Sequence, residues 1–124
     1  MSTRTIWIGR VLSWASGFFM LTSGINLALV QSEDMRAGFA NFGYPEDVIP
    51  AIGVAAFVSS LLYFIPRTSV LGAILLTGYL GGATATHVRI HDPAFAAPVV
   101  VGILLWLGLF LQDERLRALL PWRR

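Results

Sequence analysis

Hydrophobic positions along the chain form four long blocks separated by short polar segments. A helix rises about 1.5 Å per residue, so about 18 to 20 residues cross the ~30 Å hydrocarbon core of a bilayer. The pattern therefore predicts an all-α fold, a four-helix transmembrane bundle running up-down-up-down in one integral membrane domain over residues 1–124. The predicted spans are about residues 6–30, 48–65, 70–88 and 93–111, and residues 112–124 form an interfacial tail.

The longest polar segment, between the first two spans, carries a pattern of its own. Met35, Phe39 and Phe42 follow one another at i, i+4 and i+7, which predicts a short interfacial amphipathic helix. Its aromatic side faces either the lipid or the bundle. Asp47 and Asp92 precede the second and fourth spans, each with a proline close behind, so both are predicted N-caps.

Composition supports a membrane protein and removes several kinds of chemistry. Hydrophobic residues make up 56% of the chain and charged residues 13%, whereas soluble proteins carry about 25% charge. Cysteine is absent, which excludes disulfide exchange, thiolate metal sites and thiol relays. No serine, histidine and carboxylate share a plausible depth, so we predict no catalytic residue and do not expect the isolated chain to be an enzyme.

The arginines are distributed unevenly about the predicted spans. Only Arg36 and Arg89 lie in the other two polar segments, which hold most of the acidic residues. Arginine-rich loops stay in the cytoplasm, so both termini are predicted to be cytoplasmic. No basic face is free of lipid, which argues against nucleic-acid binding. Seven of the nine arginines lie on the side of the termini, namely Arg4, Arg10, Arg67, Arg115, Arg117, Arg123 and Arg124.

Two pairs of small residues are predicted to sit at helix contacts. Ser13 and Gly17 are four residues apart in the first span, and Gly78 and Gly82 have the same spacing in the third. In lipid, helices associate by close packing, which small residues allow. The contacts could be within the chain, with a partner membrane protein or with a second copy.

Polar residues that are costly in lipid gather near the outer ends of the spans. Such residues face a bundle interior or a cavity more often than lipid. We therefore predict an outer pocket covered by the Phe39–Phe42 segment. Its bounding residues are Asn26, Tyr44, Thr84 and His87, and Arg89 is a further candidate ligand contact.

Each candidate also has a simpler interpretation. His87 could donate a hydrogen bond to a quinone carbonyl or pass a proton, and its simpler interpretation is that it caps its helix. His87 and His91 together could share a metal, although we predict no metal site. Arg89 could bind an anion or pair with Asp47 or Asp92. Asn26 could hold two helices together, and the whole cluster could be a wet end of the bundle.

Several short motifs, in order, resemble the DoxX-like family of small four-span bacterial membrane proteins. They are Gly43-Tyr44-Pro45, Ile65-Pro66-Arg67, the segment from Leu76 to Ala83, His87-x-Arg89 and Leu120-Pro121-Trp122. The family takes its name from a small subunit of a thiosulfate:quinone oxidoreductase. The resemblance implies the bacterial inner membrane, a four-span fold and a possible quinone, while relatives with a thiol-based role would need cysteines that this chain lacks.

Three functions remain open from the sequence. The chain could be a small integral membrane subunit that handles a quinone or another apolar ligand for a redox partner. It could be a structural subunit that docks onto a larger membrane complex without chemistry of its own. It could also be a carrier of lipids or small solutes.

Overall fold

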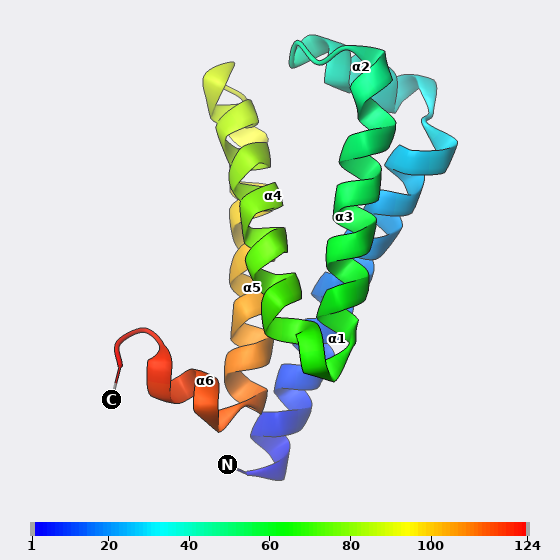
Figure 1. The fold of residues 1–124 in the computed structure, drawn as a ribbon. Coiled ribbons are helices and arrows are strands. Elements are labelled where there is room, and N and C mark those ends of the chain that lie inside the picture. The colour runs from blue at the N-terminus through cyan, green and yellow to red at the C-terminus, as the bar shows by residue number, and fades with distance from the viewer. Residues whose placement is uncertain (1, 124) are drawn as a thin grey trace.

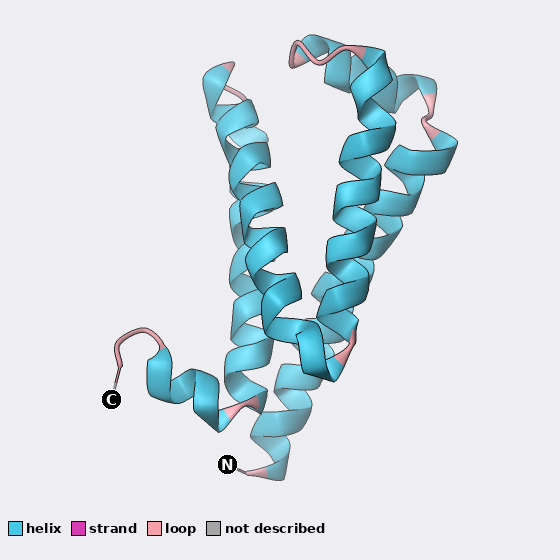
Figure 2. Ribbon diagram, in the orientation of Figure 1, coloured by secondary structure: helices cyan, strands magenta, loops and turns pink. Residues whose placement is uncertain are grey.

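The computed structural model describes residues 2–123, and within them every regular element is helical (Figures 1 and 2). Met1 and Arg124 lie outside the described residues. Arg124 is one of the seven arginines that the sequence analysis placed on the side of the termini. The elements are α1 (Thr3–Ile25), η1 (Asn26–Val30), α2 (Glu33–Asn41), η2 (Glu46–Val48), α3 (Ile49–Phe64), η3 (Pro66–Thr68), α4 (Ser69–Arg89), η4 (Pro93–Phe95), α5 (Ala96–Gln112) and α6 (Glu114–Leu119).

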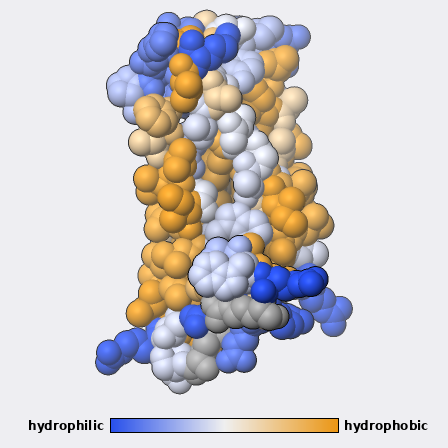
Figure 3. Space-filling model, turned by 90° about the vertical axis from the view of Figure 1, so that its left-hand side faces the viewer, coloured by the Kyte–Doolittle hydropathy of each residue, from blue (hydrophilic) through white to orange (hydrophobic). Residues whose placement is uncertain are grey.

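Four helical stretches are long and apolar enough to cross a membrane, which confirms the predicted fold class. They cover Thr3–Val30, Glu46–Phe64, Pro66–Arg89 and Pro93–Gln112. Large apolar side chains point outward along them: Phe18 is 62% exposed and Leu29 80%. In Figure 3 two bands of hydrophobic atoms flank a paler strip between the ends of the bundle, and hydrophilic atoms gather at those two ends, as a bilayer requires.

The spans form a four-sided bundle in which α1 and α4 each pack against α3 and α5. Both chain ends lie at the same end of the bundle, which we call the terminal end, and α2 lies across the opposite, distal end (Figure 1). The buried core includes Met20, Ala73, Leu76 and Leu105. These side chains fill the middle of the bundle, between its terminal and distal ends.

Two helix crossings depend on glycine because backbones touch there. A Cβ built at Gly24 of α1 would lie 2.6 Å from the backbone nitrogen of Phe57 in α3. A Cβ at Gly9 would lie 2.7 Å from the carbonyl oxygen of Gly108 in α5. Either distance is shorter than real Cβ contacts, so α1 can approach both neighbours this closely only without side chains at these positions.

The connections follow the sequence expectations in part. Residues 33–41 form the predicted short helix, and Ser32 caps it by accepting a hydrogen bond from the Met35 N–H at 3.3 Å. Asp92 caps the fourth span through the Ala94 N–H at 2.9 Å. The predicted cap at Asp47 is wrong, because Asp47 lies inside a 3₁₀ turn and no side chain caps α3.

Candidate functional site

The distal half of the bundle contains two adjoining cavities, which together we call the distal cavity. The larger, of about 350 Å³, lies among α1, α2, α4 and α5, and the smaller, of about 270 Å³, lies among α2, α3 and α4. Ligand pockets in proteins usually occupy about 300 to 1,000 Å³. The two cavities share five of their lining residues, namely Phe39, Phe42, Tyr79, Ala83 and His87.

The amphipathic segment covers this cavity, as the sequence predicted. Met35 and Phe39 project from α2 into the larger cavity, and Phe42 follows directly after the helix. The apolar side of α2 therefore faces the bundle, which decides between the two orientations that the sequence left open. The walls are mostly aromatic and aliphatic, so the cavity suits an apolar guest.

His87 and Tyr79 are the two titratable side chains in the wall of the larger cavity, and His87 is the one with polar contacts. Its Nδ1 lies 2.7 Å from the carbonyl oxygen of Ala83, and its ring lies 4.7 Å from the Phe42 ring, centre to centre. Its Nε2 is 4.0 Å from Asp92 Oδ2. Because a carbonyl oxygen only accepts, Nδ1 carries a proton in this arrangement, and Nε2 is an acceptor whenever the ring is neutral.

Two polar side chains of the distal end hold the covering segment in place. The Tyr44 hydroxyl is 2.9 Å from Thr86 Oγ1 on α4, and the Tyr44 ring packs against Phe39 at 5.6 Å. Arg89 Nη2 donates to the carbonyl oxygen of Phe42. The expected pairing of Arg89 with Asp47 or Asp92 is absent from residues 2–123, because the guanidinium binds this backbone carbonyl instead.

Two predicted boundary residues lie elsewhere. Asn26 is exposed and lines neither cavity, since the neighbouring Leu27 takes the inward position at the start of the π-helical turn. Thr84 donates to the Leu80 carbonyl oxygen at 2.8 Å and faces a groove between α4 and α5. It is three residues from His87, so the two side chains point about 60° apart around the helix.

The glycines of α4 do not pack against another helix within residues 2–123. A Cβ built at Gly78 or Gly82 would meet nothing within 4 Å, and both glycines line the smaller cavity. Of the two contacts that the sequence left open for this pair, the intrachain one is absent from residues 2–123, and a contact with a partner stays a prediction. Ser13 and Gly17 do lie at helix contacts: a Cβ at Gly17 would lie 3.1 Å from the Tyr63 ring.

The terminal half contains a polar network around Ser13, which the sequence analysis placed only at a helix contact. The buried Tyr63 hydroxyl is hydrogen-bonded to Ser13 Oγ at 2.9 Å and to the Leu105 carbonyl oxygen at 2.6 Å. Gln112 Nε2 donates to Ser13 Oγ at 2.9 Å, a contact we did not anticipate. These bonds join α1, α3 and α5 beside a cavity of about 470 Å³ that has Arg10 at its edge.

No metal centre accompanies either cavity in the part of the chain that is described. Residues 2–123 bring no three metal-binding side chains together, and His91 is exposed. The distal cavity can therefore offer a guest an apolar enclosure and a few hydrogen-bonding groups, chiefly the imidazole of His87 and the hydroxyl of Tyr79.

The comparison with known proteins gives a match to a family. The model of a family described as the DoxX-like family matches residues 11–108, which is most of the chain. No curated protein and no solved structure matches. The match includes α3, α4 and most of α1 and α5, so it covers the helices that form the distal cavity.

Proposed function

The chain belongs to the DoxX-like family, and on that premise we propose that it is a small membrane subunit that binds a quinone for a redox partner. The ligand occupies the distal cavity. Another apolar ring compound with the shape of a quinone could occupy the same cavity. The chain supplies the binding site, and electron transfer is carried out by the partner.

The observation that carries this proposal is the contrast between the largely apolar walls of the distal cavity and two of its polar side chains, His87 and Tyr79. The walls are largely aromatic and aliphatic, while His87 and Tyr79 place an imidazole and a phenol at the edge. Among the described residues, the Tyr79 hydroxyl makes no hydrogen bond. Polar groups inside a membrane protein are expensive unless they are partnered, and a ligand with ring oxygens would partner these two.

The protonation of His87 fits both redox forms of a quinone. With Nδ1–H held by the Ala83 carbonyl, a neutral ring offers Nε2 as an acceptor for a quinol hydroxyl. A protonated ring offers Nε2–H as a donor to a quinone carbonyl, with Asp92 Oδ2 4.0 Å away to stabilise the charge. The position of Nε2 therefore suits a hydrogen bond to a ring oxygen of either form.

The membrane and the orientation are also part of the proposal. The described arginines at the terminal end, which include Arg4, Arg67 and Arg117, favour a cytoplasmic location for both termini in a bacterial inner membrane. The distal cavity then lies in the outer leaflet, where it is accessible to a lipid-soluble quinone.

The test is quinone retention by the full chain purified in mild detergent. Bound lipids are extracted, and quinone per chain is measured by mass spectrometry, with added decylubiquinone as a second probe. Ala83→Leu fills the wall shared by both cavities and should reduce retention at least tenfold. Ala55→Leu makes the same change on an exposed face of α3 and should leave retention unchanged. Equal retention by both variants would contradict the proposal.

A second candidate is a structural subunit that docks onto a larger membrane complex. The open glycine face of α4 at Gly78 and Gly82 favours it, because helices in lipid associate through such surfaces. The same purification distinguishes the two functions. A stoichiometric partner protein without quinone, lost in Gly82→Leu, supports the structural function.

A further inference from the structure

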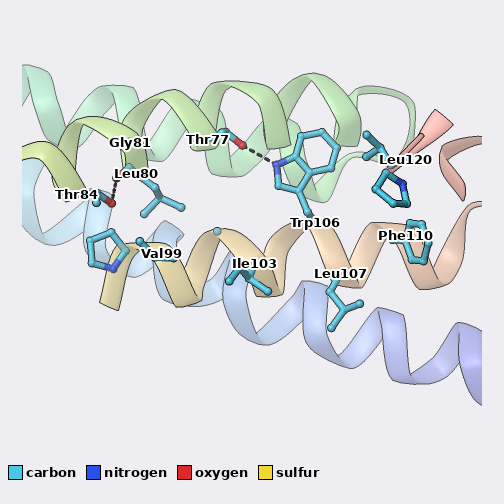
Figure 4. A pocket seen from close by; sticks show the side chains of 13 residues that line it. Thr77, Leu80, Gly81, Thr84, Val99, Ile103, Trp106, Leu107, Phe110 and Leu120 are labelled. Carbon is cyan, nitrogen blue, oxygen red and sulfur yellow. Dashed lines mark hydrogen bonds between the residues drawn. The ribbon is translucent and has the colours of Figure 1, made fainter. Parts of the chain in front are cut away.

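The outer side of α4 and α5 carries a groove of about 590 Å³ that the proposed function does not use. Figure 4 shows it from Thr84 and Val99 at one end to Phe110 and Leu120 at the other. Where the groove passes Trp106, the indole N–H donates to Thr77 Oγ1 at 2.6 Å. Both polar groups are satisfied by this bond, so the groove presents an apolar surface to its occupant.

The length of the groove matches one leaflet of a bilayer. Along α5 its lining runs from Pro98 to Phe110, which is about 18 Å at 1.5 Å per residue. Half of the ~30 Å hydrocarbon core is about 15 Å. Leu120 and Pro121 of the tail line the terminal end of the groove. A partner helix crossing the whole membrane would have to run past this end, whereas an acyl chain of one leaflet would not.

Two arginines, Arg117 and Arg123, carry positive charge at the terminal end of the groove. The Arg117 guanidinium lies 5.2 Å from the centre of the Phe110 ring, and its Nε donates to the Phe110 carbonyl oxygen at 2.9 Å. Its two terminal nitrogens, like the side chain of Arg123, have no hydrogen-bond partner within residues 2–123. Trp122, which is 67% exposed, belongs to the residue type that favours headgroup depth.

We propose that this groove is a binding site for an anionic phospholipid of the leaflet on the side of the termini. One acyl chain lies along the groove between α4 and α5, from Phe110 toward Thr84. The phosphate lies at the free nitrogens of Arg117, with Arg123 nearby in sequence as a second cation. Guanidinium pairs well with phosphate, and arginines beside a membrane surface select anionic lipids.

The test uses the full chain, stripped of lipid and reconstituted in vesicles of equal parts phosphatidylglycerol and phosphatidylcholine with identical acyl chains. After transfer to mild detergent, native mass spectrometry counts the lipids that stay bound. The parent should retain phosphatidylglycerol in preference. Arg117→Gln should lower that preference about fivefold, the effect of one arginine at a membrane surface. Arg67→Gln removes a charge on the same side and away from the groove, and should not lower it.

A second pair of variants tests the apolar part of the site. A Cβ built at Gly81 meets nothing within 4 Å, so Gly81→Leu fills the groove without displacing another helix and should reduce the retained lipid of both kinds. Ala55→Leu is the control. Equal retention of the two lipids by the parent would overturn the proposal, as would equal losses in Arg67→Gln and Arg117→Gln. A lipid-free dimer that Gly81→Leu separates would show that a second copy covers the groove.

Discussion

Replacing a glycine by alanine, which adds one methyl group, should distinguish the glycines that lie at helix contacts from those that do not. The change is Gly24→Ala, compared with Gly82→Ala. At Gly24 a Cβ would lie 2.6 Å from the Phe57 backbone nitrogen, whereas ordinary contact begins at 3.4 Å. The α1 and α3 backbones would have to separate by the difference, about 0.8 Å. At Gly82 no atom lies within 4 Å.

The expected magnitude follows from two opposing terms. Forcing a methyl group into a packed contact costs about 1 to 3 kcal/mol. Alanine favours a helix over glycine by about 1 kcal/mol, and this gain applies to both variants. Gly24→Ala should therefore lower the free energy of unfolding by up to about 2 kcal/mol, and Gly82→Ala should raise it by up to about 1 kcal/mol.

The assay is thermal unfolding of the full chain in one mild detergent. A loss of 1 kcal/mol lowers Tm by about 3 to 6 °C in a chain of this size. Gly24→Ala should melt below the parent, and Gly82→Ala at or above it. If Gly24→Ala melted as high as Gly82→Ala, the close α1–α3 crossing would be wrong. If Gly82→Ala fell while the oligomer dissociated, the glycine face would be a partner contact.

Three further predictions concern the polar groups and the orientation. Tyr63→Phe leaves Ser13 Oγ with one partner fewer and should cost about 1 to 3 kcal/mol in unfolding measurements, more than Tyr44→Phe at the half-exposed distal end. His87→Leu should abolish quinone retention without unfolding the bundle, whereas His91→Asn, at a positive φ that asparagine tolerates, should retain it. Cysteines placed at positions 2 and 124 should resist an impermeant thiol reagent in intact cells, and labelling of either from outside would reverse the orientation.

The sequence predicted the helices well because lipid leaves few alternatives. A backbone in hydrocarbon must satisfy its own hydrogen bonds, so each apolar block of sufficient length has to be a helix. The interfacial helix was predictable from Met35, Phe39 and Phe42, since its polar and apolar residues alternate with a helical period. The cap at Asp92 was predictable because proline follows it directly.

The inward faces of the spans were harder to predict because these helices are apolar on all sides. Depth placed Asn26, Thr84 and His87 together, but depth does not say which way a side chain points, and only His87 lines the distal cavity. The π-helical turn that begins at Asn26 also changes which side of the helix the following residues face, and no residue pattern in the sequence predicts such a turn. Spacing likewise favoured Gly78 and Gly82, whereas Gly24 and Gly53 make the closest approach between α1 and α3.

Photolabelling with an azido-quinone tests the central claim most directly, because it reports where a quinone sits. The purified chain is labelled, digested and mapped by mass spectrometry, with decylubiquinone as competitor. The proposed quinone site predicts label on the distal-cavity walls, at Phe39 and Phe42 or between Tyr79 and His87, and loss of label with competitor. Label confined to residues 99–110 along the outer groove, or label that decylubiquinone does not displace, would contradict it.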